Sequence, residues 1–279
     1  MKNVTRTGLA CVLLIAGAGV PASGQDSAPA EPATAAPTQA ELPSAASLFD
    51  RHIEAIGGQD AIHAVTSRKM TGRLKVFVEG KEGPVQTAVI RMIAEAPSKL
   101  IQEMVVPGQS STKIYFDGKA GWAVNIETGE ATPIEGEQLD QFATTARFYN
   151  EADYTESFKS IKTIEKRDLP TGTVYVVQVD YFSGRQAFFL FSEDNGFLVG
   201  VLGTRELNPG QRVEFRRFYE EYTDVEGVKY PTRVRESFAN LTYEISFTKI
   251  EPGAPFPEIT RPEGIPDADL SRIYKPTGG

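Results

Sequence analysis

The fold class is decided by residues 114–136, IYFDGKAGWAVNIETGEATPIEG. Two short apolar runs separated by glycine-containing turns predict strand, turn, strand and turn, after which the chain leads into a helical pattern. The stretch holds Trp122, the only tryptophan, but no residue suited to act as a nucleophile or a metal ligand. We therefore interpret the sheet itself, as an apolar surface, as the working part of the protein.

Strand patterns extend in both directions from this stretch. From Lys69 onward the apolar residues alternate with polar ones, so one strand face carries Met70, Leu74, Val76 and Val78. Short connections with Gly or Pro then separate further strands, which predicts an antiparallel meander. We expect five strands before the helical pattern, at 69–79, 85–97, 99–106, 112–116 and 121–126, and seven after it, at 161–169, 173–182, 185–192, 197–207, 211–222, 228–238 and 241–250.

Two segments have helical spacing instead. Ser44 is placed to cap a helix whose apolar stripe ends at Gly57 and Gly58. A second helix is predicted over 137–149, and its narrow stripe suggests a movable lid. About a dozen consecutive strands must curl, because a flat open sheet of that width is uncommon. We therefore predict a mostly β (α+β) protein: a strongly curved antiparallel half-barrel of about 11–12 strands, with the N-terminal helix and the inserted lid helix on its concave face.

The N-terminus has the pattern of a signal peptide over residues 1–24. A short basic region precedes an apolar run from Leu9 to Val20, and small residues precede the expected cleavage after Gly24. Cys11 raises the alternative of a lipoprotein, but most of the apolar run follows it, whereas an acylated cysteine comes after such a run. Beyond the signal peptide we expect an Ala/Pro-rich disordered linker over 25–43, a folded domain over 44–252 and a Pro-rich tail over 253–279.

Composition excludes several classes of function. Removing Lys2 and Arg6 with the signal peptide leaves 27 basic against 37 acidic residues, so we expect no nucleic-acid partner. The basic cluster EFRRFYEE (214–221) is flanked by acids and is interpreted as a solvated strand face. Cleavage also removes the only cysteine. No G-x-S-x-G motif occurs, so no hydrolase triad is expected.

The two histidines do not suggest a metal site. His52 lies in the apolar stripe of the first helix, which favours a packing histidine with a ring nitrogen on a backbone group. His63 has no carboxylate at metal-ligand spacing. We therefore expect no metal, no cofactor and no enzyme activity.

Three segments in chain order resemble the LolA-like superfamily of lipoprotein carriers. They are LFDRHIEAIGGQDAIHAVTSRKMTGRL (48–74), YFDGKAGWAVNIETGEATPIEGEQLDQF (115–142) and YEEYTDVEGVKYPTRVR (219–235). The resemblance implies a periplasmic half-barrel whose best-known members hold acylated lipoproteins or lipids in a hydrophobic cleft under a helical lid. It also implies a membrane-bound donor or acceptor protein as a possible partner.

Aromatic and aliphatic side chains are the candidate binding residues. We expect a hydrophobic cleft lined by Trp122, Leu139, Phe142, Phe215, Tyr219, Tyr243 and Phe247, although each of them also suits an ordinary core. The leading hypothesis is a periplasmic carrier of a lipid, acyl chain or acylated lipoprotein. The alternative is a non-catalytic envelope protein that docks or senses a protein partner through its sheet.

The signal-peptide pattern gives a direct prediction. We expect the exported protein to begin at Gln25, because cleavage follows small residues such as Ala22 and Gly24 after an apolar run. The intact mass of protein purified from the periplasm checks this. A lipid-modified species that begins at Cys11 would overturn it.

Overall fold

The computed structural model describes residues 42–109, 111–208, 211–271 and 273–274. The predicted signal peptide, and all of the predicted linker except residues 42 and 43, lie outside these residues. The helices of the described chain are α1 (Ala45–Ala55), α2 (Gln59–Ala64), α3 (Gly136–Ala146) and α4 (Tyr154–Ser157). None of them is long and apolar enough to cross a membrane.

Thirteen antiparallel strands form one sheet in the described chain. The first six are β1 (Ser67–Val78), β2 (Gln86–Glu95), β3 (Lys99–Val105), β4 (Thr112–Phe116), β5 (Gly121–Asn125) and β6 (Ala131–Ile134). The other seven are β7 (Ser160–Leu169), β8 (Gly172–Asp180), β9 (Gln186–Ser192), β10 (Leu198–Asn208), β11 (Gln211–Val225), β12 (Val228–Phe238) and β13 (Leu241–Pro252). Each set pairs in chain order, and the pairing of β1 with β13 joins the two sets.

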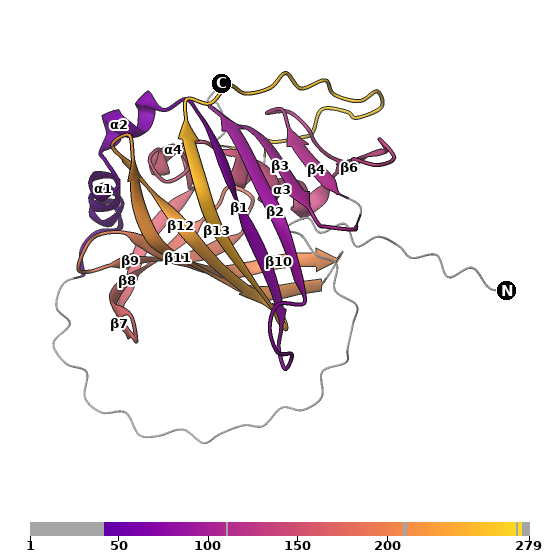
Figure 1. Ribbon diagram of the computed structural model, residues 1–279. Coiled ribbons are helices and arrows are strands. Elements are labelled where there is room, and N and C mark those ends of the chain that lie inside the picture. Colours follow the sequence, from indigo (N-terminus) through magenta and orange to yellow (C-terminus); the bar gives the residue numbers. More distant parts are fainter. Residues whose placement is uncertain (1–41, 110, 209–210, 272, 275–279) are drawn as a thin grey trace.

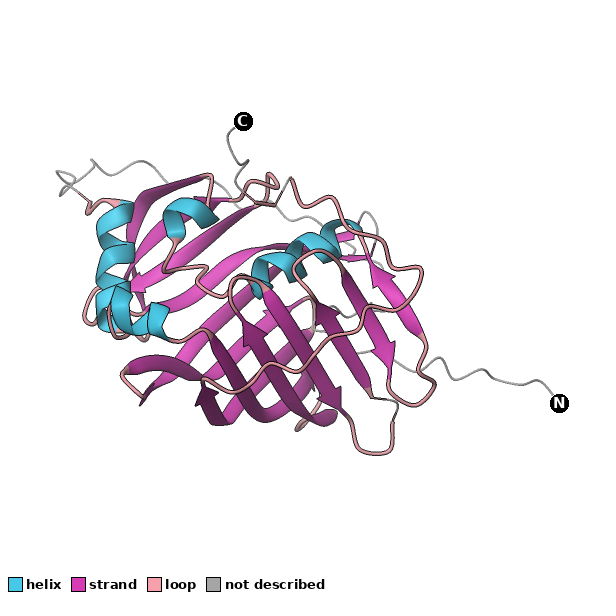
Figure 2. Cartoon of the chain, turned by 90° about the horizontal axis from the view of Figure 1, so that it is seen from above, coloured by secondary structure: helices cyan, strands magenta, loops and turns pink. Residues whose placement is uncertain are grey.

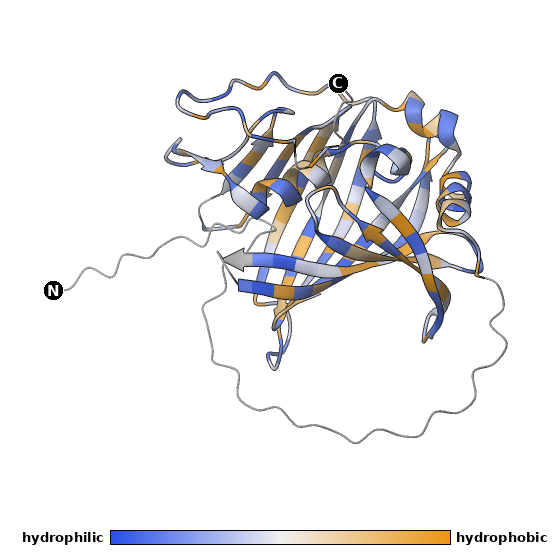
Figure 3. Ribbon diagram, turned by 180° about the vertical axis from the view of Figure 1, so that it is seen from behind, coloured by the Kyte–Doolittle hydropathy of each residue, from blue (hydrophilic) through white to orange (hydrophobic). Residues whose placement is uncertain are grey.

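The sheet is strongly curved, and the helices lie on its concave side (Figures 1 and 2). Seen from that side, hydrophobic residues colour the strands that the helices face (Figure 3). The predicted mostly β half-barrel is thus confirmed, with thirteen strands rather than 11–12. The unpredicted strand is β6, a four-residue strand that contains Pro133. Proline is tolerated there because β6 pairs only with β5 and lies at the edge of the sheet.

Gly72 sets the geometry where the two meanders meet. The register between β1 and β13 shifts at a bulge between Thr71 and Gly72. A Cβ atom on Gly72 would lie only 2.5 Å from the backbone oxygen of Ser246, so the close approach of the two strands requires glycine. The bulge increases the local twist at the centre of the sheet, where β1 pairs with β13.

Helix α1 forms as the sequence predicts. The Ser44 hydroxyl accepts a hydrogen bond from the Ser47 amide at 3.1 Å, which caps the first turn. The apolar stripe packs on the strands through Phe49, whose ring lies 4.9 Å from that of Phe191. The helix ends before Gly57, where a Cβ atom would collide with the Gly227 oxygen at 2.3 Å.

His52 is the packing histidine that its place in the stripe predicts. Its side chain is buried, and Nδ1 accepts a hydrogen bond from the Leu198 amide at 3.1 Å. Burial, opposed in part by a hydrogen bond to the Gly196 backbone, lowers the pKa of His52 to about 4. The ring therefore stays neutral near pH 7 and joins α1 to the start of β10.

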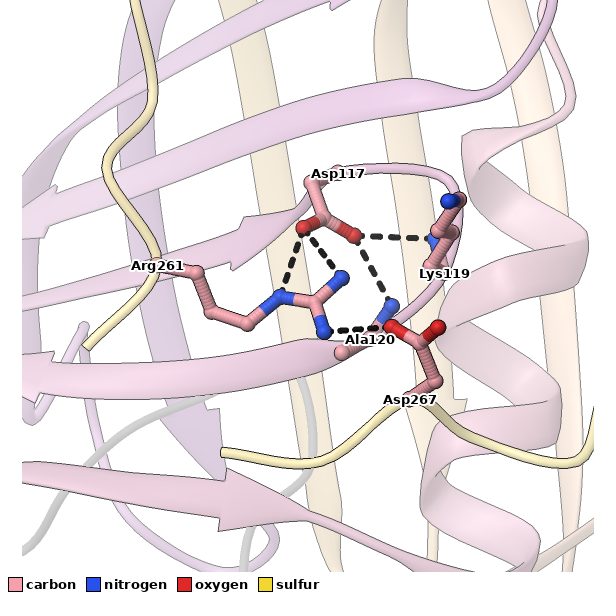
Figure 4. Close-up of polar contacts among 5 residues, drawn as sticks. All are labelled: Asp117, Lys119, Ala120, Arg261 and Asp267. Carbon is pink, nitrogen blue, oxygen red and sulfur yellow. Dashed lines mark hydrogen bonds and ion pairs between the residues drawn. The ribbon is translucent and has the colours of Figure 1, made fainter. Parts of the chain in front are cut away.

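The segment after β13, predicted as a Pro-rich tail, makes specific contacts with the sheet. Arg261 reaches Asp117 with Nε at 2.9 Å and Nη2 at 2.7 Å, and its Nη1 lies 2.5 Å from Asp267 (Figure 4). Asp117 also accepts the Lys119 and Ala120 amides at 2.9 Å, so the same carboxylate shapes the turn between β4 and β5. The charge of Arg261 and these amides hold the pKa of Asp117 below its usual range although burial opposes ionisation.

Protonation of His52 gives the fold a measurable pH dependence. Because the folded pKa lies below the unfolded value of about 6.5, only the unfolded chain takes up a proton as the pH falls from about 6.5 toward 4. His52 should therefore reduce the free energy of unfolding by about 2 kcal/mol between about pH 7.5 and pH 5.

Urea unfolding of wild type and His52→Gln at both pH values tests this. Glutamine retains an acceptor for the Leu198 amide but cannot titrate, so the variant should lose less stability on acidification by that amount. Ala46→Gln, at an exposed position of the same helix, is the matched control and should keep the wild-type pH dependence because it removes no titratable group. Equal losses for wild type and His52→Gln would contradict the prediction.

Candidate functional site

A cavity of about 380 Å³ lies between the concave face of the sheet and a roof formed by α3 and residues 147–152. The hairpin between β8 and β9 adds Tyr181 and Arg185, and α1 and α2 close one end with Ile56 and Ile62. The sheet supplies most of the remaining lining, in particular Met70, Met92, Val201, Phe215, Tyr219, Val234, Ile245 and Phe247.

Strand register explains why these residues share one space. Alternate residues of a strand face the same side, and directly paired residues on neighbouring strands do the same. One row across the sheet pairs Val201 with Arg217, Arg217 with Glu236, and Glu236 with Tyr243. The adjacent row pairs Tyr219 with Val234. The concave face therefore carries apolar and charged side chains side by side.

A buried ion cluster forms part of the cavity wall. Glu236 is 1% exposed and accepts hydrogen bonds from Arg205 and from Arg217 Nε, the latter at 2.6 Å. Burial opposes ionisation of Glu236, but the charges of Arg217 and Arg205 outweigh it and hold its pKa below the usual range. Arg205 is 4% exposed and stacks over the rings of Phe215 and Phe238 at 4.8 and 4.5 Å. One carboxylate thus pairs with two guanidinium groups, so the cluster of Glu236, Arg205 and Arg217 has a net charge of one positive unit.

The lining as a whole is positively charged. Six of its side chains are cationic, namely Arg68, Arg147, Arg185, Arg205, Arg217 and Lys229. Only Glu151 and Glu236 are acidic. The cavity is therefore amphipathic, with apolar surface from the sheet and an excess of cations, and it suits a ligand with an apolar body.

Helix α3 covers the cavity and is anchored beside it. Its Gln141, Thr144 and Thr145 face the cavity. The opposite stripe packs in a core cluster with β4 and β6, and a Cβ atom on Gly121 of β5 would lie 3.0 Å from Leu139 Cδ1. A hydrogen bond of 3.2 Å from Arg185 Nη2 to Thr144 Oγ1 links the helix to the β8–β9 hairpin. The helix ends at Ala146 rather than at residue 149, so residues 147–149 belong to the loop that completes the roof.

Three of the seven predicted cleft residues line the cavity: Phe215, Tyr219 and Phe247. Tyr243 lies on the same concave face but does not line the cavity. It is 1% exposed and stacks on Phe238 with ring centroids 5.2 Å apart, so it packs behind the residues that form the wall. Leu139 and Phe142 belong to the core cluster that anchors α3.

Trp122 lies away from the cavity, on the other face of the sheet. It pairs with Tyr115, and their rings stack 5.5 Å apart. Its neighbour Gly121 pairs with Phe116 and faces α3, so alternation turns Trp122 outward. The only tryptophan therefore does not report directly on the contents of the cavity.

Sequence reasoning missed the charged lining. The stretch EFRRFYEE, expected to be a solvated strand face, is solvated on one side only: Arg216 is exposed, whereas Arg217 faces the cavity and pairs with Glu236. The alternation of Phe215, Arg217 and Tyr219 was the available signal, since residues two apart share a face. His63, for its part, lies 2.9 Å from Asp153 through Nε2. The described residues contain no cluster of three or more potential metal ligands.

Comparison with solved structures identifies the fold. A LolA superfamily protein from Nitrosomonas europaea superposes with a TM-score of 0.54 at 11% identity, covering 77% of this chain and 96% of that one. The chain has a LolA-like fold. A DUF1329 family protein from Desulfovibrio piger gives a TM-score of 0.54 at 9% identity, over 76% of this chain and 95% of that one.

A third LolA-like structure is a putative outer membrane lipoprotein-sorting protein domain from Vibrio parahaemolyticus, with a TM-score of 0.52 at 7% identity over 76% of this chain and 93% of that one. At these identities the likeness is one of fold alone. Neither a protein-family model nor a curated protein sequence matches the chain. The resemblance seen in the sequence is thus confirmed for the LolA-like architecture.

The buried ion cluster predicts a large effect of a single substitution. Glu236→Gln removes the charge that two buried guanidinium groups share, so it should lower the free energy of unfolding by about 3 kcal/mol near pH 7. Glu214→Gln, at an exposed position of β11, is the matched control and should change it by less than about 0.5 kcal/mol.

Chemical denaturation of both variants measures the difference. Because Glu236 has a lowered folded pKa, its contribution is present above the unfolded carboxyl value of about 4.3 and is lost as the pH falls through the folded one. Equal stability of the Glu236→Gln and Glu214→Gln variants at neutral pH would show that the cluster does not stabilise the fold.

Proposed function

We propose that this LolA-like protein is a non-catalytic carrier or binding protein of the periplasm that holds an acyl chain in the cavity under α3. The observation that carries the proposal is the partly open cavity of about 380 Å³ with apolar walls from Met70, Phe215 and Phe247. The ligand is a lipid, or the acylated end of a lipoprotein, exchanged with a membrane or a membrane-bound protein.

The size of the cavity supports a single chain. Pockets that enclose a small molecule measure roughly 300–1,000 Å³, and this one lies near the lower end of that range. A ligand with several acyl chains would require the roof to move outward. Such movement is consistent with α3, whose cavity side is polar and whose anchor is a single apolar stripe.

The energetics of burial favour a carrier over a permanent binding site. Burying an acyl chain is worth about 0.8 kcal/mol per CH₂ relative to water, but transfer of the chain from a bilayer into an apolar cavity is nearly neutral. A protein with such a cavity keeps a lipid out of water and still releases it to a membrane. No metal or covalent chemistry is needed for either step.

The residues of the site have structural or binding roles in this proposal. His52 accepts a hydrogen bond from the Leu198 amide of β10, and His63 contacts Asp153, so each histidine has a structural contact. The cationic residues of the wall are suited to bind charge rather than to transfer protons, because arginine stays protonated at neutral pH. Export to the periplasm rests on the signal-peptide pattern of residues 1–24.

A substitution that fills the cavity tests the proposal. Ala152 lies in the roof loop and lines the cavity, so Ala152→Trp should displace ligand and weaken binding of a fluorescent fatty-acid probe by about tenfold or more. Val85→Trp is the matched control, because Val85 is 47% exposed in the connection between β1 and β2. The control should bind as wild type does, and both variants should melt within about 3 °C of wild type.

Native mass spectrometry of protein from its own periplasm, followed by extraction, would identify the ligand. We expect one copurified lipid per chain, absent from Ala152→Trp. A stable complex with another protein and no lipid would instead favour a partner-docking role. Equal probe binding by Ala152→Trp and Val85→Trp would place the ligand outside this cavity.

A further inference from the structure

Arg68 is a cation of the cavity wall whose guanidinium donors have no hydrogen-bond partner among the described residues. It is the second residue of β1 and lines the cavity on the same strand face as Met70. Its guanidinium carbon lies 4.8 Å from the ring centroid of Phe148 and 5.8 Å from that of Tyr230. Within the described chain its side chain donates no hydrogen bond and forms no ion pair, in contrast to Arg205 and Arg217, which share Glu236.

Two aromatic rings are an incomplete environment for this group. They stabilise the cation through their π faces, but they do not satisfy five directed N–H donors. Burial lowers the pKa of Arg68, and electrostatic interactions with Tyr230, Glu151 and Tyr149 only partly offset this effect. A guanidinium group held between rings, with its donors unused, is preorganised for the oxygens of an anion.

The other charges of the cavity do not supply that anion. Glu236 is occupied by Arg205 and Arg217. Glu151, in the roof loop, forms no ion pair with another described residue, and its carboxylate accepts a hydrogen bond from the Asn150 side chain at 3.2 Å. The remaining cations of the lining therefore outnumber the available acids, and the field inside the cavity favours a negative ligand.

The residues around Arg68 also give the direction of an apolar tail. Met70 follows it on the same face and pairs with Met92 of β2. The next position is Gly72, which pairs with Phe247 of β13. Successive residues on one strand face are roughly 7 Å apart. A tail that starts at the guanidinium group and follows this face of β1 therefore contacts the apolar side chains of the cavity wall.

We propose that Arg68 binds the anionic headgroup, a carboxylate or a phosphate, of a single-chain amphiphile whose tail lies along Met70, Met92 and Phe247. The headgroup lies between Phe148 of the roof and Tyr230 of the sheet. Because Phe148 lies two residues after the end of α3, binding of the headgroup holds the roof in place over the tail. This inference rests on the proposed function and assigns the charge class of its ligand.

Matched ligands separate headgroup recognition from tail burial. Palmitate and palmitoyl lysophosphatidic acid present a carboxylate and a phosphate, whereas hexadecanol has a similar tail and no charge. Displacement of a fluorescent fatty-acid probe from the full mature chain should show that wild type binds at least one anion roughly tenfold more tightly than the alcohol. The tighter of the two anions identifies the headgroup as carboxylate or phosphate.

Substitutions of Arg68 and Arg73, which lie on opposite faces of β1, test whether Arg68 causes the preference for an anionic ligand. Arg68→Met should abolish the preference for the anion and change binding of the alcohol by less than about threefold. Arg73→Met is the matched control, since Arg73 is exposed on the other face of the same strand, and it should keep the wild-type preference. Arg68→Lys, which keeps the charge but loses the paired donors, should be intermediate.

The outcomes are distinct. If wild type binds the alcohol and both anions equally, or if Arg68→Met keeps the preference, the headgroup assignment is wrong while the acyl-chain cavity stands. If wild type binds none of these ligands and displaces no probe, the proposed function fails. Thermal melting of each variant without ligand checks the fold, and Arg68→Met should melt no lower than wild type because it removes a partly buried charge that has no ion-pair partner in the described chain.

Discussion

The pairing of β1 with β13 is the constraint on which the rest of the structure depends. Strands β1–β6 form one meander and β7–β13 form another, and within the described chain this ladder is the pairing that joins them. It requires the close approach at Gly72, where any side chain would meet Ser246. Rows of side chains that continue from one meander to the other are aligned by this ladder.

A curved sheet with an apolar concave face must cover that face, and here the cover is partial. Helix α1 fills one end with Phe49, and α3 is anchored at the other through Leu139 and Phe142. Between these two clusters the sheet carries arginine and glutamate as well as aromatic rings, so the space cannot close as a dry core. The same charges that prevent closure make the cavity suited to an amphiphile rather than to a plain hydrocarbon.

The chain after β13 contacts both α3 and the turn between β4 and β5. Arg261 ties it to the Asp117 turn, and Ala268 donates to the Lys119 oxygen at 2.9 Å. Farther on, Ile273 is buried in the cluster that anchors α3, and Tyr274 lies under the guanidinium group of Arg147. The anchor of α3 therefore includes residues from beyond the sheet.

The sequence by itself determined the elements: the period-two pattern located twelve of the thirteen strands, Ser44 and the double glycine bounded α1, and the stripe that holds His52 predicted its packing role. It did not reveal β6, because four residues with a proline give too weak a pattern. Only the tertiary structure decided which face of each strand is concave, because alternation separates two faces without saying which one bends inward. It therefore placed Trp122 on the sheet face away from the cavity, where it is buried, and Arg68 in the cavity wall. The partnership of Arg217 and Glu236 was likewise hidden, since their pairing depends on the register between two strands, and an isolated charge in a strand pattern resembles a solvated one.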